Sequence, residues 1–286
     1  MAVYKRGYER YQGELEGRLR RFLVLPRYAF RRMFRQRLTI LILIAALIYP
    51  FLCAAFIYLV NSADLLRQFE TSFQTFLTID GRFFMYFVRV QSIFAVFLAA
   101  LTGPGLISPD LTNNALPLYF SRPLSRADYT IGRLMAPVTL LSLITWVPGL
   151  LLFLFQAAVT EGTWGMDNWR IGVGMFVGFW LWICFCGLVA VVSSAYVKMR
   201  AIAGGLVLGF FFILSGVSAM INGVFRDTWG SLLDPSWITQ RLCHALMGTE
   251  APPGPGATAS LLAFIIFLLL FVFVLERRLH PVEVVS

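Results

Sequence analysis

The sequence predicts an all-α polytopic membrane protein with six transmembrane helices, an amphipathic helix before the first span and a short cytoplasmic helix between the second and third. Hydrophobic residues make up 58% of the 286 residues and charged residues 14%, whereas about 25% of the residues in a soluble domain are charged. The 27 phenylalanines and a mean hydropathy of +0.74 exceed what a single core can bury, so lipid must solvate much of the surface.

The transmembrane domain is expected over residues 38–275, where six apolar runs are long enough to cross a bilayer. A hydrocarbon layer of about 30 Å needs about 20 helical residues. The expected spans are 38–60, 90–107, 134–159, 171–197, 201–225 and 257–275. The second begins near Phe83 instead if Arg89 lies within it. Pro50, Pro137 and Pro148 fall inside spans and predict kinks.

The distribution of basic residues predicts that both termini are cytoplasmic, because cytoplasmic segments retain Lys and Arg. Eleven basic residues precede the first span, and alternation then assigns 18 basic and 7 acidic residues to the inner segments. The outer segments hold 6 basic and 8 acidic residues. Basic residues placed beside spans also indicate contact with anionic lipid rather than with nucleic acid.

The N-terminal segment 1–37 ends in a sequence typical of an interfacial amphipathic helix that starts after Pro26. Its apolar and basic residues fall on different helical faces: Phe30, Met33 and Phe34 on one, Arg31, Arg32 and Arg35 elsewhere. The alternative is a merely basic flank of the first span.

The segment 108–128 predicts a short cytoplasmic helix held between two spans. Ser108 is a suitable N-cap, Pro109 suits the first helical position and Asp110 favours the positive end of the helix dipole. Pro117 should end this helix, and Ser125 with Asp128 forms a capping box for the next one. A loop that only reverses direction needs no such helix with apolar residues, so we expect a docking surface for a cytoplasmic partner.

The sequence of this segment resembles that of the permease subunit of type-2 ABC (ATP-binding-cassette) exporters. The similar positions are Asp110, Asn114-Ala115-Leu116-x-Leu118-Tyr119, Ser121-Arg122-Pro123-Leu124-Ser125-Arg126, Tyr129 and Gly132-Arg133. The order of elements along the chain is similar too. The resemblance implies an exporter permease in the inner membrane of a prokaryote, paired with a second permease copy or homologue and with two cytoplasmic ATPase subunits that bind ATP and Mg²⁺.

In that family the helix between spans two and three is the coupling helix, which sits in a cleft of the ATPase beside the N-terminal helix. The resemblance therefore assigns the ATPase contact to Asp110, Asn113, Asn114, Leu116, Tyr119 and Arg122, with Phe30 and Phe34 of the N-terminal helix.

The outer segment 226–256 contains an amphipathic stretch followed by a rigid APPGPG sequence. Trp229, Trp237, Leu242 and Leu246 are expected at the outer interface, on a short re-entrant or surface helix. An outer loop anchored by tryptophan is the alternative. The resembling family has short outer helices here, which are thought to close the exit. Residues 276–286 form a cytoplasmic tail.

Other functional classes lack the residues that they need. The chain has no G-x-x-x-x-G-K-[ST] motif, so we expect no cofactor bound by this chain and no catalytic activity of its own. An intramembrane enzyme would need a nucleophile or metal ligands at depth, but the histidines lie outside the spans, the carboxylates are unpaired and Cys184 and Cys186 point to different faces. An ion-coupled secondary transporter would need an acidic relay across the spans.

Four residues are candidates for lining a transport path: Arg89, Gln91, Gln156 and Asn222. An arginine within a span is functional by default, although Arg89 also suits a snorkelling position at the outer surface. The other three can equally form hydrogen bonds between helices. Glycines of the fourth and fifth spans, among them Gly174, Gly178, Gly205 and Gly209, are expected to allow close helix contact.

Overall fold

The structure is a computed structural model that describes residues 30, 33–62, 78–113, 126–160, 162–197 and 199–279. Helices and irregular segments, with no strand, make up these described residues. Six helical segments are long and apolar enough to cross a membrane: Arg37–Asn61, Gly81–Thr102, Tyr129–Val159, Trp169–Tyr196, Ala201–Phe225 and Ala257–Arg278. The predicted all-α class with six spans is therefore confirmed. Most of the expected N-terminal helix, and residues 114–125 of the coupling segment, lie outside the described residues.

The spans are α2 (Arg37–Asn61), α5 (Gly81–Thr102), α8 (Arg126–Ile144) with α9 (Trp146–Val159), α11 (Trp169–Tyr196), α12 (Arg200–Phe225) and α14 (Ala257–Leu279). In the described part of the chain, five shorter helices lie between them: η1 (Gly103–Gly105), α6 (Ser108–Thr112), α10 (Trp164–Asp167), η2 (Trp229–Leu233) and α13 (Pro235–Met247).

The second span starts at Gly81, well before the expected Val90, because Asp80 caps it. The Asp80 Oδ1 atom accepts hydrogen bonds from the backbone N–H groups of Arg82 (2.9 Å) and Phe83 (3.2 Å). These bonds satisfy two N–H groups that a helix start leaves unpaired. Arg89 consequently lies inside α5, whose last residue is Thr102 rather than Ile107.

The third span is broken at Thr145, between α8 and α9. Pro148 explains the position of the break, since its ring clashes with the carbonyl group three to four residues earlier. The Thr145 N–H donates to both Leu141 (3.1 Å) and Ser142 (3.3 Å), so the last turn of α8 tightens before α9 begins. The helices α2 and α8 continue through Pro50 and Pro137.

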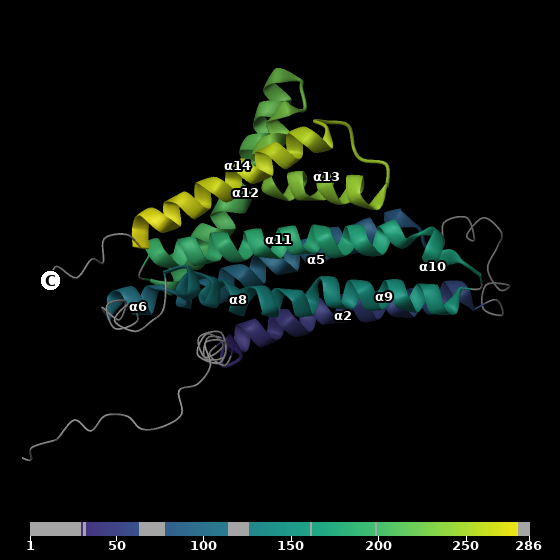
Figure 1. Cartoon of the computed structure of the whole chain (residues 1–286), viewed down its shortest axis with the longest axis horizontal. Coiled ribbons are helices and arrows are strands. Elements are labelled where there is room, and N and C mark those ends of the chain that lie inside the picture. Colours follow the sequence, from purple (N-terminus) through teal and green to yellow (C-terminus); the bar gives the residue numbers. More distant parts are fainter. Residues whose placement is uncertain are drawn as a thin grey trace, which may run out of the picture.

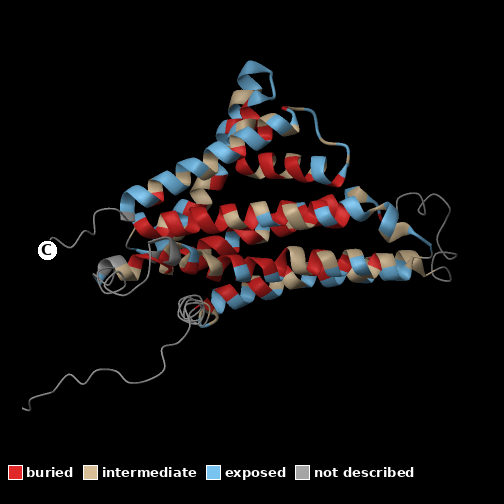
Figure 2. Ribbon diagram, viewed as in Figure 1, coloured by how far each residue is buried: buried red, intermediate tan, exposed pale blue. Residues whose placement is uncertain are grey.

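Helix α11 is the centre of the bundle. It packs against α5, α8, α9, α12, α13 and α14, and 72% of its most apolar stretch is buried, against 17% for α12 and for α14. Figure 1 shows α2, α5, α8–α9 and α11 running alongside one another, with α12 and α14 on one side of them. In Figure 2 these two helices are largely exposed, while α11 is largely buried.

A cluster of phenylalanines joins α12 and α14 to α11. The Phe185 ring of α11 lies with its centroid 5.5 to 6.2 Å from rings of both neighbours: Phe210, Phe211, Phe264, Phe267 and Phe271. Centroid separations in this range are typical of favourable aromatic pairs. Part of the high phenylalanine content therefore serves protein packing rather than contact with lipid.

The segment 226–256 contains η2 and α13, and α13 packs against α11, α14, α5 and α12. Asp234 caps α13 by accepting from the Ser236 N–H (2.8 Å), and Gly248 ends it with a φ of 71°. Added Cβ atoms at Gly174 and Gly178 would lie 2.8 Å from the Met247 nitrogen and 2.3 Å from the Cys243 sulfur. Helix α13 therefore runs antiparallel to α11, and the expectation that these glycines allow close helix contact is confirmed.

Helix α13 is attached to α12 through a polar contact at its start. The Ser215 hydroxyl, near the middle of α12, donates to Asp234 Oδ2 (2.8 Å) at the start of α13. Leu242 is buried and Trp237 is half-buried against the core, whereas Trp229 is 61% exposed and Leu246 37% exposed. Two of the four residues expected at the interface, Trp237 and Leu242, therefore pack against protein.

Candidate functional site

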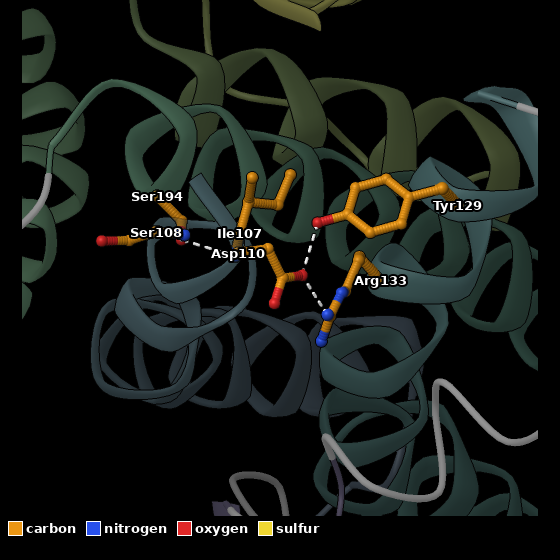
Figure 3. A network of polar contacts seen from close by, with 6 residues as sticks. All are labelled: Ile107, Ser108, Asp110, Tyr129, Arg133 and Ser194. Atoms are coloured by element: carbon orange, nitrogen blue, oxygen red, sulfur yellow. Dashed lines mark hydrogen bonds and ion pairs between the residues drawn. The ribbon is translucent and has the colours of Figure 1, made fainter. Parts of the chain in front are cut away.

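A buried polar network holds the start of the segment between the second and third spans (Figure 3). Helix α6 is about one turn long, with backbone hydrogen bonds from Asp110 to Ile107 (2.9 Å) and from Asn113 to Pro109 (3.0 Å). Pro109 lies in the first turn and Asp110 beside it, as the sequence predicts. The network connects this turn to α8 and α11.

Asp110 is paired with two residues of α8. The Tyr129 hydroxyl donates to Asp110 Oδ2 at 2.7 Å, and Arg133 forms an ion pair with the same oxygen. Tyr129 and Arg133 are four residues apart and so share one helical face, with the guanidinium carbon 5.3 Å from the tyrosine ring centre. Only 14% of the Asp110 side chain and 11% of the Arg133 side chain are exposed. Removing one partner of such a pair leaves an uncompensated charge, which costs about 3–5 kcal/mol.

Ser194 fastens the same turn to α11. Its Oγ atom accepts from the backbone N–H groups of Ile107 (2.9 Å) and Ser108 (3.1 Å), and the side chain is fully buried. Just before this turn, a Cβ atom at Gly103 would lie 2.6 Å from the Ala190 Cβ, so η1 approaches α11 at a distance that only glycine allows. The connection from α5 to α6 is therefore fixed on two sides by buried contacts.

The last turn before the first span packs beside this network. The Phe30 and Phe34 rings lie 4.9 Å apart, and both pack against the hydrophobic cluster that contains Met33, Ile107 and Tyr129. The apolar side of this turn therefore faces the bundle. The preceding residues 1–29 are not described.

The six expected ATPase contacts between the second and third spans divide into three groups. Asn113 is exposed at the end of α6. Asp110 points inward to Tyr129 and Arg133, and so holds α6 in place. The remaining four, Asn114, Leu116, Tyr119 and Arg122, lie outside the described residues.

Gln91 compensates for a proline in a neighbouring helix. Pro50 has no N–H group, so the Ala46 carbonyl four residues earlier in α2 lacks its helical donor. The Gln91 amide nitrogen donates to that carbonyl at 2.9 Å, from a side chain that is fully buried in α5. This contact joins the first two spans.

Gln156 and Asn222 also form hydrogen bonds between elements. Gln156 accepts from Asn61 (3.0 Å) and donates to Thr160 (2.8 Å), which joins α9 to the end of α2. Asn222 donates to Ser231 at 2.9 Å, which joins α12 to η2. Of the four candidates for lining a path, only Arg89 has an exposed side chain.

Tyr129 and Arg133 stand among the positions that resemble the family, but the sequence assigns no site role to them or to Ser194. The spacing of Tyr129 and Arg133 was a usable signal, because it places an aromatic and a basic residue on one face at the start of a span. Ser194 follows Ser193 at the end of an otherwise apolar run, which is a weaker signal. Among the described residues, no group of three or more His, Cys, Asp or Glu side chains could hold a metal ion.

One face of α12 carries glycines with no neighbour among the described residues. Added Cβ atoms at Gly205, Gly216 and Gly223 would meet nothing within 4 Å. Gly205 and Gly216 are eleven residues apart and Gly216 and Gly223 seven apart, and both spacings return a helix to the same face within about 20°. The three glycines therefore form one stripe along the exposed side of α12.

Comparison with known proteins gives one family match. The model described as ABC-2 family transporter protein matches residues 28–275, which include the first five spans, most of the sixth and the polar network. A search among curated proteins gives no match.

Proposed function

This chain belongs to the ABC-2 family of transporter proteins, and from that premise we propose that it is the permease subunit of an ATP-driven exporter. The family and the six spans make it a multi-pass membrane protein with a transport role. The finer proposal is that separate ATPase subunits drive it through the segment between the second and third spans. The observation that carries this proposal is the buried attachment of α6 to α8 and α11.

We propose that the end of the bundle that holds α6 faces the cytoplasm of a prokaryotic cell. The start of α2, the link from α11 to α12 and the end of α14 lie at this same end (Figure 1). The basic residues Arg35, Arg37, Arg277 and Arg278 gather there, which the positive-inside rule favours for a cytoplasmic surface. Both termini would then be cytoplasmic.

Two ATPase subunits would act on this end mechanically. A displacement of residues 114–125 would reach α8 through Asp110 and Arg133, and α11 through Ser194, because these contacts are short and buried. Since α11 packs against most of the other spans, its movement would repack the bundle. ATP binding can drive this change only if the ATPase contacts one state of the permease more favourably than the other.

ATP and Mg²⁺ belong to the ATPase partners in this proposal, and the permease itself is not an enzyme. The absence of a phosphate-binding glycine loop from its sequence supports this division of roles.

We also propose that a second permease copy, or a close homologue, packs along the glycine stripe of α12. Small residues let helix backbones approach closely in a membrane, where packing drives association. The open space beside Gly205, Gly216 and Gly223 provides room for such a helix.

The proposal is tested by Asp110→Asn in the complex with its ATPase, reconstituted in vesicles. The substitution removes the negative charge and leaves Arg133 without its ion pair. We expect ATP-driven transport to fall at least about tenfold per ATP hydrolysed, which is a coupling loss of about 1.4 kcal/mol. The control is Asp227→Asn, which changes an exposed carboxylate in the turn after α12.

The two variants separate coupling from general damage. Equal transport per ATP in Asp110→Asn and in the control would contradict the role of α6 as the attachment. Transport by the permease alone, driven by an ion gradient without ATP, would contradict the exporter proposal itself.

A further inference from the structure

Five basic side chains gather at the other end of the bundle, around the second half of α13. They come from three helices: Arg82 and Arg89 of α5, Arg170 of α11, and Arg241 and His244 of α13. The position of a Cβ atom at Gly81 lies 2.3 Å from Thr249 and 3.8 Å from Ile171, so the starts of α5 and α11 meet the turn that follows α13. We call these five residues the basic cluster.

Three members of the basic cluster lie close to one another: Arg89, Arg241 and His244. Arg241 and His244 are three residues apart and so share one face of α13, and α13 packs against α5. The His244 Nδ1 atom lies 2.8 Å from the Thr249 hydroxyl, and Arg241 donates to the Pro252 carbonyl at 2.9 Å. Burial lowers the pKa of His244, and the nearby positive charges of Arg241 and Arg89 lower it further.

The basic cluster holds more positive charge than its acidic neighbours balance. Glu250 pairs with Arg82 at 3.0 Å, and Asp80 caps the start of α5. Arg170 lies against Gly248, 3.4 Å from the position of an added Cβ atom. In the part of the chain that the structure describes, Arg89, Arg170 and Arg241 form no ion pair.

The exposed stripe of α5 changes character along its length. Arg82, Tyr86 and Arg89 occupy its first half, and Ile93 and Phe97 continue it towards the other end. Arg89 lies about 12 Å along the helix from Gly81 at 1.5 Å per residue, a depth at which an unpaired guanidinium is costly in hydrocarbon. A basic region followed by an apolar one matches an amphiphile with an anionic headgroup and an acyl chain.

We propose that Arg89, Arg241 and His244 bind the phosphate headgroup of an anionic lipid, with its acyl chain along Ile93 and Phe97. The planar guanidinium of Arg89 suits two parallel hydrogen bonds to phosphate oxygens. That this lipid is the transported molecule rests on the proposed exporter function. The binding itself belongs to the permease alone and needs no ATPase.

Binding is measured on the purified permease in nanodiscs of phosphatidylcholine, titrated with phosphatidylglycerol or with inorganic phosphate. We expect saturable binding of phosphatidylglycerol, weakened about tenfold by Arg89→Gln and by Arg241→Gln, since each substitution removes a charge-assisted hydrogen bond to the phosphate. Arg226→Gln, an exposed arginine in the turn after α12, is the matched control and should bind as the wild type does. Thermal unfolding of each variant shows whether it has folded.

The pH dependence adds a second readout. A bound phosphate favours the charged form of His244, whose pKa in the free protein is lowered, so binding takes up a proton and strengthens as the pH falls. The charged groups that act on this ring are Arg89 on α5 and Arg241 on its own helix, with Arg170 and the Glu250–Arg82 pair at the same end. His244→Gln should remove this pH dependence and leave the binding at high pH unchanged.

Three results would overturn the inference: equal binding by Arg89→Gln and Arg226→Gln, binding of inorganic phosphate as tight as that of the lipid, or pH dependence that persists in His244→Gln. Loss of ATP-driven transport with intact lipid binding would count against the proposed function and leave the lipid site standing.

Discussion

A single residue can replace the hydrogen bond that a proline removes, as Gln91 does for Pro50. The bond from Gln91 to the Ala46 carbonyl crosses from α5 to α2 and lies in a fully buried position. In the membrane no water can donate a hydrogen bond to an unpaired carbonyl. The bond from Gln91 therefore explains how α2 accommodates a proline in its interior.

The effect of Gln91→Leu on the stability of the protein should therefore depend on Pro50. In the wild-type background we expect the free energy of unfolding to fall by about 1–3 kcal/mol, the usual cost of leaving a buried polar group unpaired. In a Pro50→Ala background the alanine N–H can pair with Ala46, and the loss should be close to zero. Thermal unfolding of the four proteins in detergent measures this coupling, and equal losses in both backgrounds would exclude the compensation.

Sequence alone gave only part of this residue-level result. A proline in a span predicts a free carbonyl four residues earlier, and a glutamine in another span is a candidate donor. Which helix faces which, and in what register, depends on packing between segments that are distant in the chain. For the same reason the pairing of Tyr129 and Arg133 with Asp110 became visible only in the fold.

At the scale of elements, hydropathy located the spans and local caps set their ends. The six apolar runs correspond to six helices, but α5 begins where Asp80 caps it rather than where the hydrophobic run starts. The third span divides where Pro148 forces a break. A hydropathy window averages over about 19 residues and therefore does not resolve such terminal interactions.

The contact between α11 and α13 makes a testable prediction about two small residues. Gly178→Ala places a Cβ atom 2.3 Å from the Cys243 sulfur, and we expect overpacking to cost about 1–3 kcal/mol. Cys243→Ala in the same chain removes the sulfur and should therefore restore the stability that Gly178→Ala loses. The alanine at position 178 also favours the rescue, because alanine is a better helix former than glycine by about 1 kcal/mol. The melting temperatures of the single and double variants measure this rescue.

The control for that pair is Gly209→Ala, where the added Cβ atom makes only an ordinary contact, 3.8 Å from the Ile213 side chain. It should be neutral or slightly stabilising. A double variant as unstable as Gly178→Ala would show that the cysteine does not set the spacing of α11 and α13.

At the scale of the whole molecule, burial is uneven in a way that suits half of a larger assembly. Helix α11 is enclosed, whereas the apolar stretches of α12 and α14 are only 17% buried. Lipid can cover exposed apolar side chains. A row of glycines with open space beside it instead favours the close approach of another helix. This combination is the physical basis of the proposed second copy.

Gly216→Leu should weaken association without unfolding the protomer. The added side chain fills space that is empty within the described residues, so the melting temperature of the monomer should not fall. We expect the dimer fraction, measured by light scattering in detergent, to drop relative to Val217→Leu, which adds bulk beside the stripe. An unchanged dimer fraction would remove α12 as the interface.

Central to the proposed function is that an ATPase subunit contacts and moves the segment between the second and third spans. A photo-reactive amino acid at position 119, introduced into the permease in its native membrane, tests this most directly, with the same probe at Met166 in α10 as the control. The account predicts a cross-link from position 119 to a nucleotide-binding subunit and none from position 166. A cross-link to that subunit from position 166 alone, or from neither position, would contradict the account.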